Sequence, residues 1–227
     1  MATFRTPLTL YSMDFDTFTA LAIRLKAAPL PGLASHRKMA PSRRLEALNN
    51  AAIAQRNPKK AAVIALFYPD AVHETRFLLT MRKEYKGVHS NQVSFPGGKL
   101  EASDKDIKSA GLRETYEEVG IAPDAIEIFK DLSELYIPPS NFRVWPFMGM
   151  LRERPLFTPQ ASEVAELIEV RLADLLDEHT VDHERLNTSY AKHITTPVFK
   201  LNGYTVWGAT AMMLSEVKEL FKMCYTI

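Results

Sequence analysis

The sequence predicts an α/β protein in which a mixed β-sheet is sandwiched between helices. Strand-like runs dominate the middle of the 227-residue chain, whereas both ends carry apolar residues at helical spacing. No internal repeat or low-complexity linker divides the chain, and its length is sufficient to bury a full core. We therefore expect a main domain over residues 61–227 with a helical N-terminal segment, residues 1–60, packed on it.

Two helices are predicted in the N-terminal segment. Asp14 can cap the first, which ends before Pro29 and has one apolar face. That face consists of Phe15, Phe18, Leu21, Ala22 and Leu25. The second amphipathic helix is expected over about 42–55 and stops at Asn57-Pro58.

The main domain is predicted to contain several short strands, two of them flanking a turn around Asp70. The expected strands are 61–67, 77–82, 92–95, 125–132, 142–151, 164–170, 198–201 and 204–207. The third strand is expected to stop at Pro96-Gly97-Gly98, and a helix over about 104–119 follows it. A closing helix is expected over 209–221.

Composition excludes several classes of protein. A formal net charge of +1 argues against a general nucleic-acid binder, which normally carries a basic excess. The single cysteine, Cys224, rules out an internal disulfide framework and a cysteine-based zinc site. We expect a cytoplasmic protein without a membrane partner, because the N-terminus lacks a signal-peptide pattern and any apolar run near about 18 residues. The oligomeric state is open, with a homodimer as one option.

A basic stretch lies between His36 and Lys60, where Glu46 is the one acidic residue. It is either a solvated helix face, as charge runs usually are, or an anion-facing patch beside a phosphate-bearing substrate.

The most informative segment combines Gly97-Gly98-Lys99 with three carboxylates on the following helix, Glu114, Glu117 and Glu118. Their i, i+3 and i+4 spacing places them on one helical face, where like charges repel. A bound cation would offset that repulsion, and Mg²⁺ prefers such oxygen ligands. The alternative is an exposed acidic face on which Arg113 pairs with Glu117 at i+4.

The two glycines before the helix favour a ligand site, because glycine lets the main chain approach a ligand closely. Taken alone, Gly97 and Gly98 could instead form a plain turn after a strand. Gly120 is expected to end the helix as a left-handed cap.

From Gly98 onward, the order of residue types resembles the Nudix box. The matching residues are Gly98, Asp104, Arg113, Glu114, Glu117, Glu118, Gly120 and Ile121. In the common form of the box, the acidic residue stands eight positions before the arginine. In this sequence that position is Lys105, and the acid, Asp104, stands nine positions before Arg113. This longer spacing resembles the coenzyme A pyrophosphatase branch of the family.

A second motif is similar to the same branch. Residues 78–82, Leu-Leu-Thr-Met-Arg, and residues 95–98, Phe-Pro-Gly-Gly, match the motif of the coenzyme A-directed enzymes. Lys83, Gly87 and Asn91 depart from it. The similarity covers roughly residues 61–221.

The resemblance implies a Nudix-type α/β/α sandwich that uses Mg²⁺, with Mn²⁺ as a substitute. It implies hydrolysis of the diphosphate bond in coenzyme A or its derivatives, giving adenosine 3′,5′-bisphosphate and (acyl-)4′-phosphopantetheine. The alternatives are another nucleoside diphosphate derivative, such as a sugar nucleotide or a dinucleotide, or a non-catalytic nucleotide sensor.

The resemblance also assigns roles to individual residues. The expected metal ligands are Glu114, Glu117 and Glu118. The expected catalytic residues are Glu114, Glu117 and Arg113, and Asp104 is placed to pair with Arg113. The expected substrate-binding residues are Arg82, Gly97, Gly98 and Asn141. The general base stays open among Glu114, Glu117, Glu163 and Glu166.

Overall fold

The computed structural model describes residues 13–41, 53, 55–83, 92–186 and 194–225. The main-sheet strands are β1 (Lys59–Pro69), β2 (Thr75–Arg82), β3 (Val93–Ser94), β4 (Gly97–Lys99), β5 (Glu127–Asp131), β6 (Leu135–Ile137), β7 (Phe142–Met150) and β8 (Val164–Arg171). A second sheet contains β9 (Val181–Leu186), β10 (Ile194–Leu201) and β11 (Tyr204–Val206). The α-helices are α1 (Phe15–Ala27), α2 (Leu33–Lys38), α5 (Ile107–Val119), α6 (Leu172–Leu176) and α7 (Gly208–Tyr225). Short 3₁₀ turns occur at Pro123–Ala125, Pro138–Ser140 and Glu178–Thr180.

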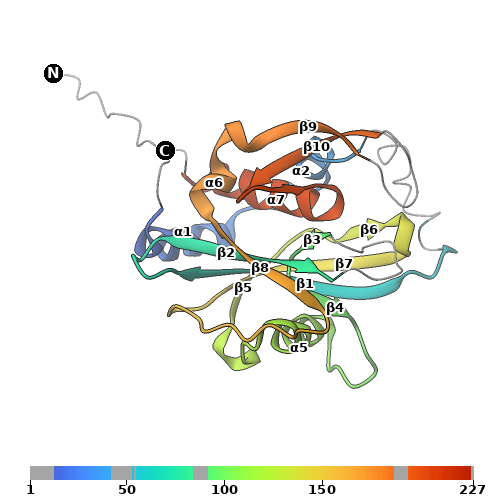
Figure 1. The fold of residues 1–227 in the computed structure, drawn as a ribbon, viewed down its shortest axis with the longest axis horizontal. Coiled ribbons are helices and arrows are strands. Elements are labelled where there is room, and N and C mark those ends of the chain that lie inside the picture. Colours follow the sequence, from blue (N-terminus) through green and yellow to red (C-terminus); the bar gives the residue numbers. More distant parts are fainter. Residues whose placement is uncertain (1–12, 42–52, 54, 84–91, 187–193, 226–227) are drawn as a thin grey trace.

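The described residues form a layered α/β structure around a mixed sheet. The sheet runs in the order β3-β2-β1-β7-β5, with β4 beside β1, β6 beside β7 and β8 beside β2. β1 and β7 are parallel, whereas the other pairs in this sheet are antiparallel. Helix α5 covers one face of the sheet, and α1, α7 and the second sheet lie on the other (Figure 1). The predicted sandwich with a mixed sheet is therefore confirmed.

The central strand β1 separates two apolar cores. Because successive side chains of a strand point to opposite faces, Ile64 and Leu66 pack toward α5 in a cluster that contains Val119. Phe67 points the other way and stacks on Phe18 of α1, with 5.1 Å between the ring centroids. A strand buried on both faces must be apolar almost throughout, as β1 is.

The N-terminal helices join the second of these cores. Asp14 caps α1 by accepting a 2.8 Å hydrogen bond from the Thr17 amide, as predicted. Glu216 of α7 is fully buried. Its Oε1 accepts hydrogen bonds from the Gly32 amide and the Ser133 hydroxyl, and its Oε2 accepts one from the Ser133 amide and lies 3.2 Å from His36 Nε2. The predicted division at residue 60 stays a prediction. The predicted helix over 42–55 lies outside the described residues, except for Ile53 and Gln55, which are helical.

The structure differs from the predicted elements at the glycine pair. We expected the chain to leave the sheet at Pro96, but Gly97–Lys99 form β4, in which Gly97 pairs with Val63 of β1. The sequence pattern missed this strand because glycine has a low strand propensity and the pairing is with a distant segment. The 3-residue β6, the edge strand β9 and the short helices α2 and α6 were not predicted either.

Among the described helices, none combines the length and the apolar character that a membrane crossing requires.

Candidate active site

Helix α5 carries the three glutamates, and its two ends fix its position. At the start, Asp106 and Ser109 form a reciprocal capping box with hydrogen bonds of 2.7 and 2.9 Å. The helix therefore begins after Asp104, slightly later than predicted. At its end, Gly120 adopts the predicted left-handed conformation with φ 77°. Between these ends, Gly111 lets the helix pack closely on β1, and Glu114 and Glu118 face β4.

Glu118 is the most deeply buried of the three. Its side chain is 3% exposed, and its Oε2 accepts a 3.0 Å hydrogen bond from the Gly97 amide. Its Oε1 lies 3.5 Å from Arg82 Nη2. Burial raises the pKa of Glu118 to about 7, although the charge of Arg82 and the Gly97 amide act in the opposite direction. A buried carboxylate of this kind gains stability when a cation approaches it.

Glu114 lies directly over the main chain of Gly98. A Cβ atom at position 98 would stand 2.8 Å from Glu114 Oε1 and closer still to the other carboxylate oxygen. Burial raises the pKa of Glu114, and Arg113 opposes that increase. The absent side chain of Gly98 is therefore what makes room for the Glu114 carboxylate.

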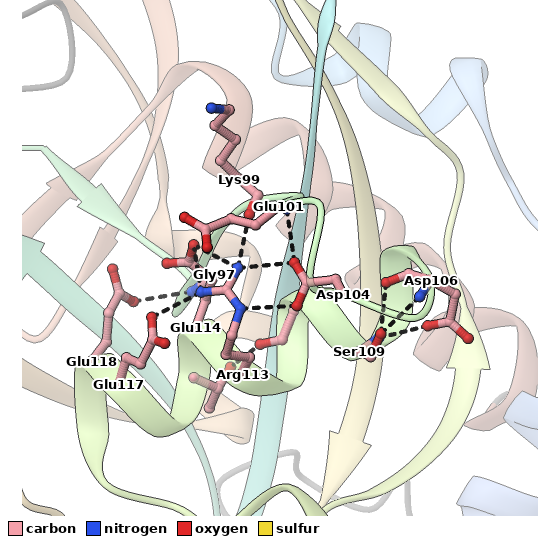
Figure 2. A network of polar contacts seen from close by, with 12 residues as sticks. Gly97, Lys99, Glu101, Asp104, Asp106, Ser109, Arg113, Glu114, Glu117 and Glu118 are labelled. Carbon is pink, nitrogen blue, oxygen red and sulfur yellow. Dashed lines mark hydrogen bonds and ion pairs between the residues drawn. The ribbon is translucent and has the colours of Figure 1, made fainter.

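Arg113 connects the helix to the loop that precedes it (Figure 2). Its guanidinium binds Asp104 bidentately, at 2.9 and 3.0 Å, and donates to the Lys99 carbonyl at 3.0 Å. It also contacts Glu114 at 3.3 Å and Glu117 at 2.9 Å. The hydrogen bonds from Arg113 hold the pKa of Asp104 below its usual value. The predicted pairing of Asp104 with Arg113 is confirmed.

Glu117 differs from its two neighbours on the helix, because half of its side chain, 51%, is exposed. It forms the i+4 pair with Arg113 that the exposed-face alternative expects. Glu114 and Glu118 are nevertheless largely buried, with side chains 16% and 3% exposed. The described geometry is thus more than an ordinary solvated acidic face.

The donor chemistry fits a hard divalent cation. In the described parts of the chain, no three His, Cys, Asp or Glu side chains are already gathered around one point. Mg²⁺, however, usually takes only one or two carboxylates and completes its shell with water and substrate phosphate oxygens. Glu114 and Glu118, one helical turn apart and held beside Gly97-Gly98, could supply such a pair.

The charge of a further carboxylate, at the end of the loop between β7 and β8, acts on this pair. The loop is attached to the end of α5, where Thr158 and Gln160 donate backbone hydrogen bonds of 2.9 Å to the Val119 and Glu118 carbonyls. The negative charge of Glu163, at the end of this loop, contributes to the raised pKa values of Glu114 and Glu118. Sequence reasoning had no signal for these backbone contacts.

Glu166, the other late carboxylate considered, has a different environment. It pairs in register with Met81, a residue that packs toward the α1 and α7 side of the sheet. Its side chain hydrogen-bonds to Tyr204, which raises the pKa of that tyrosine. Of the two candidates, Glu163 is the one that acts electrostatically on the glutamates of α5.

The two remaining predicted substrate-binding side chains are placed differently. Arg82, the last residue of β2, reaches the Gly97 carbonyl at 3.2 Å and contacts Glu118. Asn141 precedes β7, and its side chain accepts a 2.9 Å hydrogen bond from Tyr136 and donates one of 3.0 Å to the Arg56 carbonyl. Among the contacts of the described residues, none joins Asn141 to the α5 glutamates. Among the described residues, the structure therefore gathers the predicted site residues beside the α5 glutamates, with the exceptions of Asn141 and Glu166.

Comparison with known proteins places these features in context. The model of the NUDIX domain family matches residues 58–192, which is more than half of the chain. "Nudix hydrolase 22, chloroplastic" from Arabidopsis thaliana is 32% identical over 162 residues, covering 69% of this chain and 53% of that protein. "Uncharacterized Nudix hydrolase NudL" from Pectobacterium atrosepticum is 32% identical over 157 residues, covering 67% of this chain and 79% of that protein.

The chain spans about half the length of the Arabidopsis relatives that it matches. Among solved structures, the Nudix hydrolase RenU from M. smegmatis aligns with a TM-score of 0.50 and 15% sequence identity. That alignment covers 73% of this chain and 87% of the other. At this level of identity, the likeness concerns the fold alone.

Proposed function

Because this chain belongs to the NUDIX domain family, we propose that it is a magnesium-dependent pyrophosphohydrolase acting on a nucleoside diphosphate derivative. The observation that carries the proposal is the pair of buried carboxylates, Glu114 and Glu118, held beside the main chain of Gly97-Gly98. Buried acids that lack a full set of compensating partners are common where a protein binds a cation.

The burial of each glutamate side chain indicates its proposed role at the metal site. Glu114 and Glu118 would hold the metal ion, with Mn²⁺ as a substitute for Mg²⁺, and the half-exposed Glu117 would orient a water or hold a second ion. Bound Mg²⁺ would polarise phosphoryl oxygens and lower the pKa of a coordinated water. Arg113 keeps the Lys99–Asp104 loop against α5, so the main chain of Gly97-Gly98 keeps its place beside the carboxylates.

The general base is proposed to be Glu163. It is exposed, it acts electrostatically on both Glu114 and Glu118, and its backbone is fixed because the Glu163 carbonyl accepts a 2.9 Å hydrogen bond from the Lys83 amide. Glu114 and Glu117 remain alternatives, because each is a carboxylate of α5 beside the proposed metal site and a carboxylate can accept a proton.

The proposed substrate is coenzyme A or a derivative, cleaved to adenosine 3′,5′-bisphosphate and (acyl-)4′-phosphopantetheine. The support is the resemblance of residues 78–82 and 95–98 to the motif of coenzyme A-directed enzymes. Lys83 departs from that motif, and Gly87 and Asn91, which also depart from it, lie outside the described residues. A sugar nucleotide or dinucleotide is the alternative substrate, and a non-catalytic nucleotide sensor is the alternative function.

A substrate screen tests this proposal. The protein is incubated with Mg²⁺ and, separately, with coenzyme A, a nucleotide sugar and a dinucleoside polyphosphate, and the products are separated by chromatography. Adenosine bisphosphate from coenzyme A supports the proposed substrate, whereas turnover of another compound alone rejects it in favour of the alternative substrate. Binding without turnover of any diphosphate would favour the sensor. A cytoplasmic location and a homodimer stay predictions that this screen does not address.

A further inference from the structure

Two arginines contact the α5 glutamates, and they are held very differently. Arg113 forms hydrogen bonds through all three guanidinium nitrogens, including the bidentate pair with Asp104. In the described part of the chain, the contacts of Arg82 are made through Nη2 alone, to the Gly97 carbonyl at 3.2 Å and to Glu118 at 3.5 Å. The first distance is at the upper end of the ordinary range for an N–H···O hydrogen bond, and the second is beyond it. Arg113 is therefore fixed, whereas Arg82 is loosely attached.

The position of Arg82 allows it to leave. It is the last residue of β2, its side chain is 33% exposed, and the pairing of β2 with β8 is irregular between Met81 and Arg82. Glu118, in contrast, is buried and anchored by the Gly97 amide. If the contact between Arg82 and Glu118 breaks, the arginine side chain would therefore move and the carboxylate would stay in place.

A cation that binds Glu118 would compete with Arg82 for the same carboxylate. The two positive charges would repel each other at short range, and this repulsion would weaken the contact between Arg82 and Glu118. The guanidinium would then lie beside a bound cation, next to Gly97-Gly98, and a planar guanidinium is well suited to bind a diphosphate with two hydrogen bonds.

We propose that Arg82 is an exchangeable counter-ion of this site: it pairs with Glu118 while the site holds no divalent cation, and it moves to the diphosphate of the substrate when cation and substrate bind. This inference rests on the proposed function, because it requires a divalent cation at Glu118. It assigns Arg82 a positioning role in the empty site and a diphosphate-binding role in the loaded one.

The two roles predict opposite effects of one substitution. In Arg82→Gln, Mn²⁺ no longer competes with a positive charge, so the free protein is expected to bind Mn²⁺ about fivefold more tightly, as suits the loss of a partly exposed ion pair. The same variant, saturated with Mn²⁺, is expected to bind the non-hydrolysable diphosphate imidodiphosphate about tenfold more weakly. A residue with a merely structural role would weaken both.

The experiment measures Mn²⁺ binding by electron paramagnetic resonance and imidodiphosphate binding by calorimetry, after circular dichroism has verified the fold of each variant. Arg82→Lys keeps the charge and is expected to bind Mn²⁺ with wild-type affinity. Arg152→Gln is the matched control, since Arg152 forms an exposed pair with Glu127 and its loss changes the net charge equally. That control is expected to leave Mn²⁺ affinity unchanged.

The outcomes separate this inference from the proposed function. If the wild type binds Mn²⁺ and Arg82→Gln binds it no more tightly, the proposed exchange of Arg82 is wrong, but the proposed metal site is still supported. Equal tightening by Arg82→Lys or by Arg152→Gln would also overturn it, because the effect would not come from the charge at position 82. If the wild type binds no Mn²⁺, the proposed function is wrong and the exchange falls with it.

Discussion

Gly98→Ala is expected to damage the site while leaving the fold intact. The new Cβ would stand 2.8 Å from Glu114 Oε1, whereas ordinary contacts begin at 3.4 Å, so that oxygen must move by at least the difference of 0.6 Å and its partner oxygen by more. The obstacle is the end of a flexible side chain, and no positive φ is required at this position. We therefore expect the free energy of unfolding to fall by about 1 kcal/mol or less.

The expected effect on catalysis is much larger than the effect on stability. Displacing the carboxylate of Glu114, a proposed metal ligand, by about 1 Å is expected to lower kcat/KM about a hundredfold. The assay pairs steady-state kinetics on the best substrate of the screen with thermal unfolding of the metal-free protein. Wild-type kcat/KM in a folded Gly98→Ala variant would refute the argument that Glu114 must lie over Gly98.

Gly97→Ala provides the matched contrast. Its Cβ would stand 2.6 Å from Val63 Cα and closer to the Ala62 carbonyl oxygen, and Gly97 has φ 138°. Because backbone cannot move aside as a side chain can, this variant is expected to lose several kcal/mol of stability, about 3 kcal/mol or more. If both variants unfolded at the same temperature, the distinction between the two glycines would be wrong.

Three further predictions concern carboxylates. Glu118→Gln is expected to lower kcat/KM by about a thousandfold or more. The variant is expected to keep the thermal stability of the metal-free protein, because a neutral amide is easier to bury than a carboxylate. Near wild-type turnover would remove Glu118 from the proposed ligands. In steady-state kinetics, Glu163→Gln is expected to lower kcat about a hundredfold, whereas Glu166→Gln should leave kcat unchanged. A larger loss of kcat in Glu166→Gln than in Glu163→Gln would reject Glu163 as the base. Burial raises the pKa of Glu216, but hydrogen bonds from His36 and Ser133 outweigh burial and lower it. Glu216 therefore stabilises the fold above its unfolded pKa of about 4.3 and loses that contribution as the pH falls through its lower folded value. Urea unfolding across this range should show a smaller pH dependence in Glu216→Gln, and an unchanged profile would contradict the assignment.

Local signals were sufficient for the parts of the fold that depend on neighbouring residues. The cap at Asp14 and the left-handed end at Gly120 follow from short-range backbone requirements, and the structure contains both. The pairing of Arg113 with Asp104 and with Glu117 likewise follows from spacing along one helix and its preceding loop.

Other features depend on distant segments, and the sequence could not determine them. β4 exists because β1 offers it a partner, although its two glycines have little strand propensity of their own. The choice between Glu163 and Glu166 depends on how β8 pairs with β2, including the irregularity after Met81. Asn141 was a plausible ligand-binding amide by type, but its local turn and its bonds to Tyr136 and Arg56 already use both of its polar ends.

The central claim is that the acidic face of α5 binds a divalent cation. Anomalous diffraction from crystals soaked in Mn²⁺ tests it most directly. We predict an anomalous peak beside the carboxylates of Glu114 and Glu118 that is lost in Glu118→Gln. Well-ordered crystals that show no peak at these side chains, or the same peak in Glu118→Gln, would contradict the claim.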